Sequence, residues 1–276
     1  MEFTSDDARA HYDAVRDVLA GVVVGLDFDG TLSPVVDDPA AARLHPAAPG
    51  ALLDLAEAVR AVAVITGRPA RQAIAMGDLD ALGNAMLDRG AELFVFGQYG
   101  NERWSATEQR IRSPRPPAGL ATFERELPSV LRRAGAPDAF IEEKGLAVAV
   151  HTRRMADPSG AFDRLVKPIA SLAERHHLTV EPGRNVIEVR SGDMHKGQAL
   201  RAFVAEQEAD GVVFGGDDLG DIEAFEAVRA LRADGLPGLV VCSASTEQPD
   251  LVRLADVVVD GPPGVVEMLG ALVRDR

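Results

Sequence analysis

The sequence is poor in cysteine, in aromatic residues and in long apolar runs. Its only cysteine, Cys242, has no partner for an intrachain disulfide, so nothing indicates a secreted fold held by disulfides. No apolar run approaches the roughly 18 to 20 residues that a membrane-spanning helix requires. The acidic first residues, Met1 to Asp7, lack the apolar stretch of a signal peptide. We therefore expect a cytoplasmic protein.

Positive charge is also scarce. The 276 residues include 29 Lys and Arg against 43 Asp and Glu, which gives a formal net charge of −14. Nucleic acids and anionic membranes attract clustered positive charge, so we expect neither as a partner, and no obligatory protein partner is evident. What is present, 46% hydrophobic and 26% charged residues, is typical of a soluble globular chain with a sizeable core.

Short, continuously apolar runs predict strands that are buried on both faces. These runs lie at 22–26, 62–65, 93–96, 211–214, 239–242 and 257–259. Helical patterns lie before or between them, at 6–20, 48–60, 197–207 and 221–232. Alternating strands and helices predict right-handed crossovers and a parallel sheet, so the predicted fold class is α/β.

The middle of the chain has a different pattern. A proline cluster at 113–117 ends the first α/β segment. Two helical patterns follow, at 118–134 and 160–176, with strand patterns at 139–141, 146–150, 178–180 and 185–189 and a turn at 181–184. We interpret residues 112–193 as a small α+β insertion into a discontinuous core made of 1–111 and 194–276.

The first predicted strand ends in Asp27-Phe28-Asp29-Gly30-Thr31-Leu32. Ligands collect at the carboxyl edge of an open parallel sheet, and two carboxylates separated by one residue can converge there. Such a pair suits covalent phosphoryl transfer, in which one carboxylate attacks phosphorus and the other protonates the leaving oxygen. The alternative is an Asp-rich turn, but the preceding buried strand favours a site.

Two further signals are weaker when taken singly. Thr66-Gly67-Arg68 follows the second strand, where its hydroxyl and amides could hold phosphate oxygens, although such a sequence is also common in loops. Lys196 begins a helix, an end that prefers negative charge, so it makes sense if an anion binds there. A solvated surface lysine is the alternative.

A second acidic cluster follows the strand at 211–214. Asp217, Asp218 and Asp221 bring three carboxylates within five residues, which is costly unless a cation shares the site. Oxygen ligands with no nearby cysteine suit Mg²⁺ rather than zinc. A solvated acidic loop is the competing interpretation, but four signals at strand and helix ends reinforce one another.

The order D-x-D-G-T, T-G-R, insertion, K-G and G-D-D-x-x-D resembles the haloacid dehalogenase superfamily of phosphotransferases. Within it, the chain is most similar to the trehalose-6-phosphate phosphatase family, a subclass with an α/β cap. The supporting segments are 97–100, 142–144, 151–153, 183–190 and 216–225. The resemblance implies a Rossmann-like parallel-sheet core, the insertion as a cap that sets specificity, and a Mg²⁺-dependent phosphatase of a small sugar phosphate.

The resemblance also implies roles for single residues. Asp27 would be the nucleophile and Asp29 the general acid and base, while Thr66 and Lys196 would bind the transferring phosphoryl group. The Mg²⁺ ligands would come from five aspartates, namely Asp27, Asp29 (through its backbone carbonyl), Asp217, Asp218 and Asp221. Four cap residues would bind the sugar or, alternatively, only form an exposed charged face: Glu142, Lys144, Arg153 and Glu188.

The sequence departs from the family pattern at a few positions. Tyr99 stands where the family usually has His, Gly220 where it has Thr, and Ile222-Glu223 where it has Glu-Asp. These changes leave the expected catalytic groups in place but affect substrate identity. Trehalose 6-phosphate is the first expectation, and another disaccharide, pseudo-disaccharide or glycosyl-glycerate phosphate is the alternative. A phosphomutase or a non-catalytic sugar-phosphate sensor is less consistent with the retained groups.

Overall fold

The computed structural model describes all residues except 37, 184, 193 and 244–248. The described residues form two compact units. The first contains Met1–Ser113 and Met194–Arg276, and the second contains Pro114–Asp193.

A mostly parallel sheet runs through the first unit. Among the described residues it has the strand order β1-β12-β11-β10-β2-β3-β4-β5. The strands are β1 (Glu2–Phe3), β2 (Val22–Leu26), β3 (Ala61–Ile65), β4 (Glu92–Gly97), β5 (Glu102–Ser105), β10 (Gly211–Gly216), β11 (Gly238–Ser243) and β12 (Val257–Val259). Of the strands formed by the described residues, only β1 and β5, at the two edges of this sheet, pair antiparallel to their neighbours. The predicted α/β class and parallel sheet are therefore confirmed.

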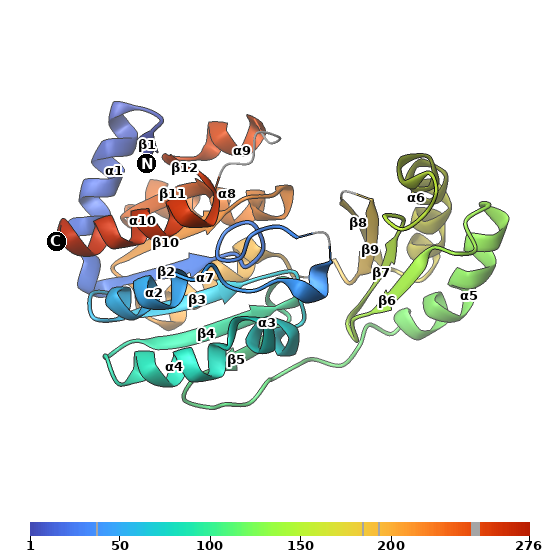
Figure 1. The fold of residues 1–276 in the computed structure, drawn as a ribbon, viewed down its shortest axis with the longest axis horizontal. Coiled ribbons are helices and arrows are strands. Elements are labelled where there is room, and N and C mark those ends of the chain that lie inside the picture. Colours follow the sequence, from blue (N-terminus) through green and yellow to red (C-terminus); the bar gives the residue numbers. More distant parts are fainter. Residues whose placement is uncertain (37, 184, 193, 244–248) are drawn as a thin grey trace. The chain divides into compact units, whose positions relative to one another are not determined.

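Helices cover both faces of this sheet (Figure 1). Alternate residues along β2 enter different apolar clusters, Val24 on one face and Val23 on the other. The first face is covered by α1 (Asp6–Asp17), α2 (Ala48–Ala56), α3 (Ala70–Gly77), α4 (Leu79–Leu87) and α10 (Gly261–Arg274). The second is covered by α7 (Lys196–Glu206), α8 (Ile222–Ala233) and α9 (Pro249–Leu254). Burial on both faces explains why the sheet strands are continuously apolar.

The second unit is an antiparallel sheet packed against two helices. Its strand order is β6-β7-β9-β8, with helices α5 (Leu120–Arg133) and α6 (Pro158–Arg175). The strands are β6 (Phe140–Glu143), β7 (Ala147–His151), β8 (Thr179–Gly183) and β9 (Val186–Arg190). Val148, Val150, Ile187 and Val189 pack on the helices, while the residues between them face the other way. One sheet face is therefore left for polar side chains.

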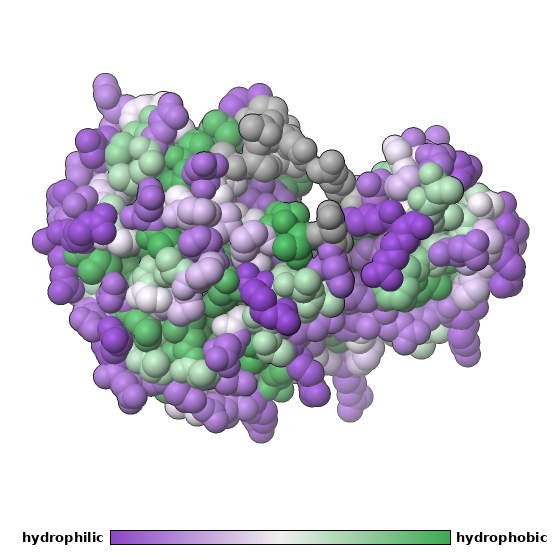
Figure 2. Space-filling view, viewed as in Figure 1, coloured by the Kyte–Doolittle hydropathy of each residue, from purple (hydrophilic) through white to green (hydrophobic). Residues whose placement is uncertain are grey.

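The predicted turn at 181–184 is wrong for its first three residues. Glu181, Pro182 and Gly183 continue β8 and pair in register with β9, and Arg184 lies outside the described residues. A proline is tolerated there because β8 is an edge strand, where a residue without a backbone N–H does not interrupt the pairing with a second neighbour. On the side shown in Figure 2, hydrophobic and hydrophilic residues are interspersed over the first unit. Among the described residues, no helix is long and apolar enough to cross a membrane.

Candidate active site

The carboxyl ends of three neighbouring parallel strands carry most of the predicted site. Asp27 follows β2, Thr66 follows β3 and Asp217 follows β10, and β2 pairs with both other strands. The backbone pairing continues past the end of β2, because the amide of Asp27 donates to the carbonyl of Gly215 at 2.9 Å. The backbone pairing of the sheet therefore fixes the position of Asp27, the candidate nucleophile.

Lys196 is buried and paired with two of the carboxylates, so the interpretation as a solvated surface lysine is wrong. Its side chain is 3% exposed, and Nζ donates to Oδ1 of Asp27 and to Oδ1 of Asp221, each at 2.7 Å. Burial alone would lower the pKa of Lys196, but the facing carboxylates of Asp221 and Asp27 raise this pKa well above its usual value. Lys196 therefore holds a positive charge at the base of the site.

Asp221 organises the acidic loop. Its Oδ1 accepts from Lys196, while Oδ2 accepts from the backbone amides of Asp217 at 2.9 Å and Asp218 at 3.2 Å. Asp218 is exposed, and its Oδ1 caps the short helical turn η4 (Leu219–Asp221) by accepting from the amide of Gly220. The three aspartates of this cluster thus differ in their surroundings: Asp221 is buried, Asp217 half-buried and Asp218 exposed.

The cluster is suited to a divalent cation. Asp27, Asp217 and Asp221 each offer an oxygen, and the three oxygens lie within 4.8 Å of one another. Burial and the neighbouring Asp27 raise the pKa of Asp217 to about 10, and burial raises the pKa of Asp221 to about 6 despite Lys196. Burial also raises the pKa of Asp27. One lysine does not balance these carboxylates. Among the described residues the grouped donors are carboxylate oxygens, which are the ligands of a hard cation such as Mg²⁺.

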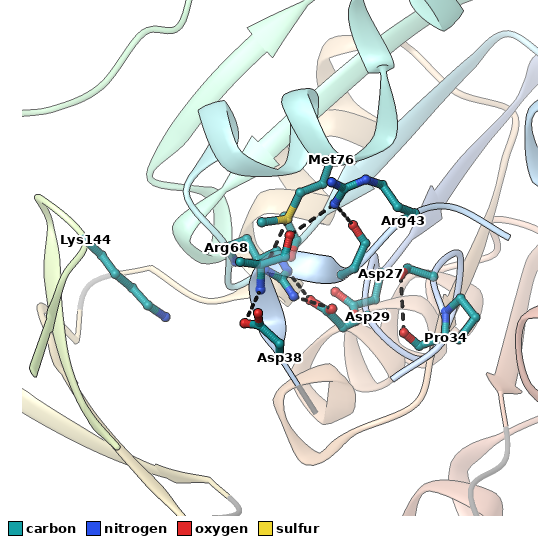
Figure 3. Close-up of polar contacts among 12 residues, drawn as sticks. Asp27, Asp29, Pro34, Asp38, Arg43, Arg68, Met76 and Lys144 are labelled. Atoms are coloured by element: carbon teal, nitrogen blue, oxygen red, sulfur yellow. Dashed lines mark hydrogen bonds and ion pairs between the residues drawn. The ribbon is translucent and has the colours of Figure 1, made fainter. Parts of the chain in front are cut away.

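Asp29 points toward Arg68 and not into the carboxylate cluster. Nε and Nη2 of Arg68 donate to the two oxygens of Asp29 at 2.5 and 2.7 Å, as Figure 3 shows. Thr66 is buried, and its Oγ1 accepts from the backbone amide of Arg68 at 3.1 Å. The motif Thr66-Gly67-Arg68 therefore lies at the same edge as Asp29, as the sequence predicts, but the sequence does not indicate the pairing of Arg68 with Asp29.

A residue that sequence reasoning missed supports the Asp27–Gly30 turn. Ser243, at the end of β11, is buried and donates from Oγ to the carbonyl of Gly30 at 2.6 Å. Gly30 has φ +74, and a Cβ built on it would lie 2.0 Å from Oδ2 of Asp217. The backbone of the first acidic turn therefore touches the carboxylate of the second, which only glycine permits. A serine at a strand end carries no distinctive sequence signal.

Three of the four predicted sugar-binding residues lie on the polar face of the second unit's sheet. Glu142, Ala149 and Glu188 are cross-strand neighbours, and Lys144 Nζ is 2.5 Å from Oε2 of Glu188. The side chains of Lys144 and Glu188 are only 13% and 8% exposed, so these two are not simply solvated charges. Oε2 of Glu142 lies 2.9 Å from Nε2 of His151.

Arg153, the fourth of these residues, follows β7 in a turn and is exposed. It therefore lies apart from Glu142 and Glu188, which are on strands, and from Lys144, which directly follows β6.

Solved structures with the same fold define the class. A haloacid dehalogenase-like hydrolase from Bacteroides thetaiotaomicron matches with a TM-score of 0.63 at 14% identity over 91% of this chain and 98% of its own. The C-terminal domain of the trehalose-6-phosphate phosphatase of C. albicans matches with a TM-score of 0.73 at 19% identity, covering 99% of this chain and 98% of that domain. At these identities the likeness establishes a haloacid dehalogenase-like fold.

The chain belongs to the trehalose-phosphatase family, whose model matches residues 25–93 and 124–257. A trehalose-phosphate phosphatase of Mycolicibacterium paratuberculosis (strain ATCC BAA-968 / K-10) is 32% identical over 273 residues, which cover 95% of this chain and 65% of that protein. A Mycobacterium tuberculosis protein named as an uncharacterized glycosyl hydrolase is 34% identical over 285 residues, 99% of this chain and 20% of that protein. The chain thus spans less than two thirds of each of these two relatives.

Proposed function

We propose that this chain hydrolyses a sugar phosphate monoester, with trehalose 6-phosphate as the first substrate, to free sugar and inorganic phosphate. The observation that carries the proposal is the buried bridge from Lys196 to both Asp27 and Asp221 beside Asp217. A positive group fixed between a nucleophile and further carboxylates suits a reaction that brings a dianionic phosphate against an aspartate. Membership of the trehalose-phosphatase family supports the substrate class.

In the first step, a carboxylate oxygen of Asp27 attacks phosphorus and the bond from phosphorus to the sugar oxygen breaks. Asp29 gives its proton to that leaving oxygen, so that free sugar departs and an aspartyl phosphate remains. In the second step, Asp29 takes a proton from water, the water oxygen attacks phosphorus, and the bond to Asp27 breaks. Inorganic phosphate leaves and both aspartates return to their starting state.

Lys196 and the Thr66 hydroxyl are assigned to the phosphoryl oxygens. Asp27, Asp217 and the backbone carbonyl of Asp29 would hold Mg²⁺. Asp221 would be an outer group because both of its oxygens already accept protein hydrogen bonds, and the exposed Asp218 would be a second outer group. When bound, Mg²⁺ supplies positive charge that offsets the repulsion between a carboxylate and a phosphate dianion. Arg68 contacts both oxygens of Asp29, so it fixes the orientation of the carboxyl group that would exchange the proton.

The second unit is assigned as the cap that recognises the sugar, through Glu142, Lys144, Arg153 and Glu188. The paired Lys144 and Glu188 favour this interpretation because a nearly buried ion pair on the polar sheet face fixes both a donor and an acceptor in place. Sugar hydroxyls need both kinds of partner at once.

The proposal is tested by measuring phosphate release, in the presence of Mg²⁺, from a panel of substrates. The panel contains trehalose 6-phosphate, sucrose 6-phosphate, glucosyl- and mannosyl-glycerate phosphates, glucose 6-phosphate and an aryl phosphate. We expect trehalose 6-phosphate to be preferred, and Asp27→Asn to abolish turnover without unfolding the chain. Activity on the aryl phosphate alone would keep the chemistry and overturn the substrate. Substantial turnover by Asp27→Asn would overturn the nucleophile, and product formation without net phosphate would indicate a mutase.

A further inference from the structure

The short turn η3 (Gln98–Gly100), which follows β4, has an unusual backbone. Gln98 has φ 48 and Tyr99 has φ 62, so two successive residues with side chains occupy the left-handed region. Each such residue costs on the order of 1 kcal/mol or more, and the surrounding structure must enforce it. Here the loop of Thr66 enforces this backbone. The amide of Gln98 donates to the carbonyl of Arg68 at 2.8 Å, and the amide of Tyr99 donates to the carbonyl of Thr66 at 2.9 Å.

This backbone places the Tyr99 ring against two glycines from different loops. A Cβ built on Gly67 would lie 2.9 Å from Cζ and 3.0 Å from Oη of Tyr99. A Cβ built on Gly220 would lie 3.7 Å from Cε1 of the same ring. Gly67 is the centre of Thr66-Gly67-Arg68, and Gly220 immediately precedes Asp221. The ring therefore packs tightly beside the loop of Thr66, and its edge lies within one added methyl group of the loop of the acidic cluster.

We propose that Tyr99 is a positioning residue that sets the spacing between the Thr66 loop and the Asp217–Asp221 loop. The ring requires glycine at 67, and a side chain larger than a methyl group at 220 would meet its edge. Tyr99 and Gly220, which both depart from the family pattern, are therefore one matched pair. The role in turnover rests on the proposed function, whereas the effect on the acidic loop does not.

A double-mutant cycle separates this role from a general loss of packing. We expect Gly67→Ala to lower kcat/KM by about 10-fold or more in the presence of Tyr99, but by less than about 3-fold in the Tyr99→Ala background, where the obstructing ring is gone. Tyr99→Phe keeps the ring and should retain the wild-type spacing. Gly50→Ala is the matched control, since a Cβ on Gly50 meets nothing within 4 Å.

Titration calorimetry with Mg²⁺ alone gives a readout without substrate. We expect Tyr99→Ala to weaken Mg²⁺ binding by about 3-fold or more and Tyr99→Phe to leave it unchanged, whereas a purely structural role would lower Tm without this difference. Additive effects of Gly67→Ala and Tyr99→Ala on both kcat/KM and Mg²⁺ affinity would overturn the proposal. If the wild type hydrolyses no sugar phosphate, the proposed function fails. The same double-mutant cycle, measured through Mg²⁺ affinity and Tm, would still test the positioning role of Tyr99.

Discussion

Lys196 donates a 2.7 Å hydrogen bond to Asp27 from 169 positions away in the sequence, and both side chains are almost completely buried. The same Nζ reaches Asp221, so one ammonium group joins the first acidic turn to the second. A buried charge is costly unless it is paired, which means that these three side chains depend on each other. The catalytic assignment and the stability of the core are therefore linked at this point.

Replacing Lys196 with Met should remove both activity and stability. The two carboxylates would lose their shared partner, which costs about 3 to 5 kcal/mol for a buried pair, and kcat should fall by about 100-fold or more. Steady-state rates and the urea midpoint, each with and without Mg²⁺, measure the two effects. The same substitution at an exposed lysine, Lys167→Met, serves as the control and should change neither quantity. Near wild-type kcat in Lys196→Met would contradict the assignment.

Asp217→Asn should stabilise the protein when divalent cations are removed. The pKa of Asp217 is raised from 3.8 to about 10, so the folded chain holds a proton that the unfolded chain releases, and stability falls as pH rises between these values. The asparagine avoids this penalty. In EDTA we expect its Tm to exceed that of the wild type by about 3 °C or more at pH 8, with a smaller difference at pH 5.

Added Mg²⁺ should reverse that order. It should raise the Tm of the wild type and leave that of Asp217→Asn nearly unchanged, because the variant has lost a carboxylate ligand. Differential scanning calorimetry at both pH values, with EDTA or Mg²⁺, measures this. Equal Mg²⁺ stabilisation of the two proteins would show that Asp217 is not a ligand.

Breaking the ion pair between Arg68 and Asp29 should lower kcat. Arg68 is the group that orients Asp29, since it contacts both carboxylate oxygens. Arg68→Gln should lower kcat by about 10-fold or more with little change in Tm, because the Asp29 side chain is 37% exposed and solvent can replace the lost contact. Arg68→Lys should recover part of kcat. An unchanged kcat in Arg68→Gln would show that Asp29 needs no such partner.

The sequence predicts the core sheet well because burial on both faces makes its strands continuously apolar. The edge strand β5 is missed for the converse reason: Glu102-Arg103-Trp104-Ser105 contains no apolar run, and β5 is held by pairing with β4. The helix bounds also differ by a few residues, as in the predicted helix 48–60, which ends at Ala56. The local pattern of apolar and polar residues indicates which strands are buried, but it does not specify which strands pair at the edge of the sheet.

Within the candidate site, residue types were predictable and pairings were not. The motifs name Asp29 and Lys144, but their partners Arg68 and Glu188 lie 39 and 44 positions away. Such pairs depend on how loops close and which side chains are buried, and neither spacing nor composition contains that information. The proximity of Tyr99 and Gly220 is a further example, in which two local departures in the sequence are neighbours in space.

Ser243→Ala should weaken the acidic turn without removing a reacting group. The lost hydrogen bond to the carbonyl of Gly30 leaves a buried acceptor, which costs about 1 to 3 kcal/mol. Because Gly30 contacts Asp217, Mg²⁺ affinity should also fall. Calorimetric titration with Mg²⁺ and thermal unfolding measure the two effects, and Ser243→Thr, which keeps the hydroxyl, should restore Mg²⁺ affinity. If Ser243→Ala lowers Tm while Mg²⁺ affinity stays constant, the serine only stabilises the fold.

The ion pair of Lys144 and Glu188 should act on substrate recognition and not on the chemical step. Glu188→Gln keeps the shape of the side chain and removes its charge, so Lys144 loses its partner and the polar sheet face rearranges. We expect KM for trehalose 6-phosphate to rise by about 10-fold, while kcat/KM for an aryl phosphate, which carries no sugar hydroxyls, stays within about 2-fold. Parallel assays of both substrates measure this.

The exposed Glu143→Gln, on the same strand as Glu142, is the matched control and should change neither value. Equal losses on both substrates would place Glu188 in the folding of the second unit instead of in sugar binding.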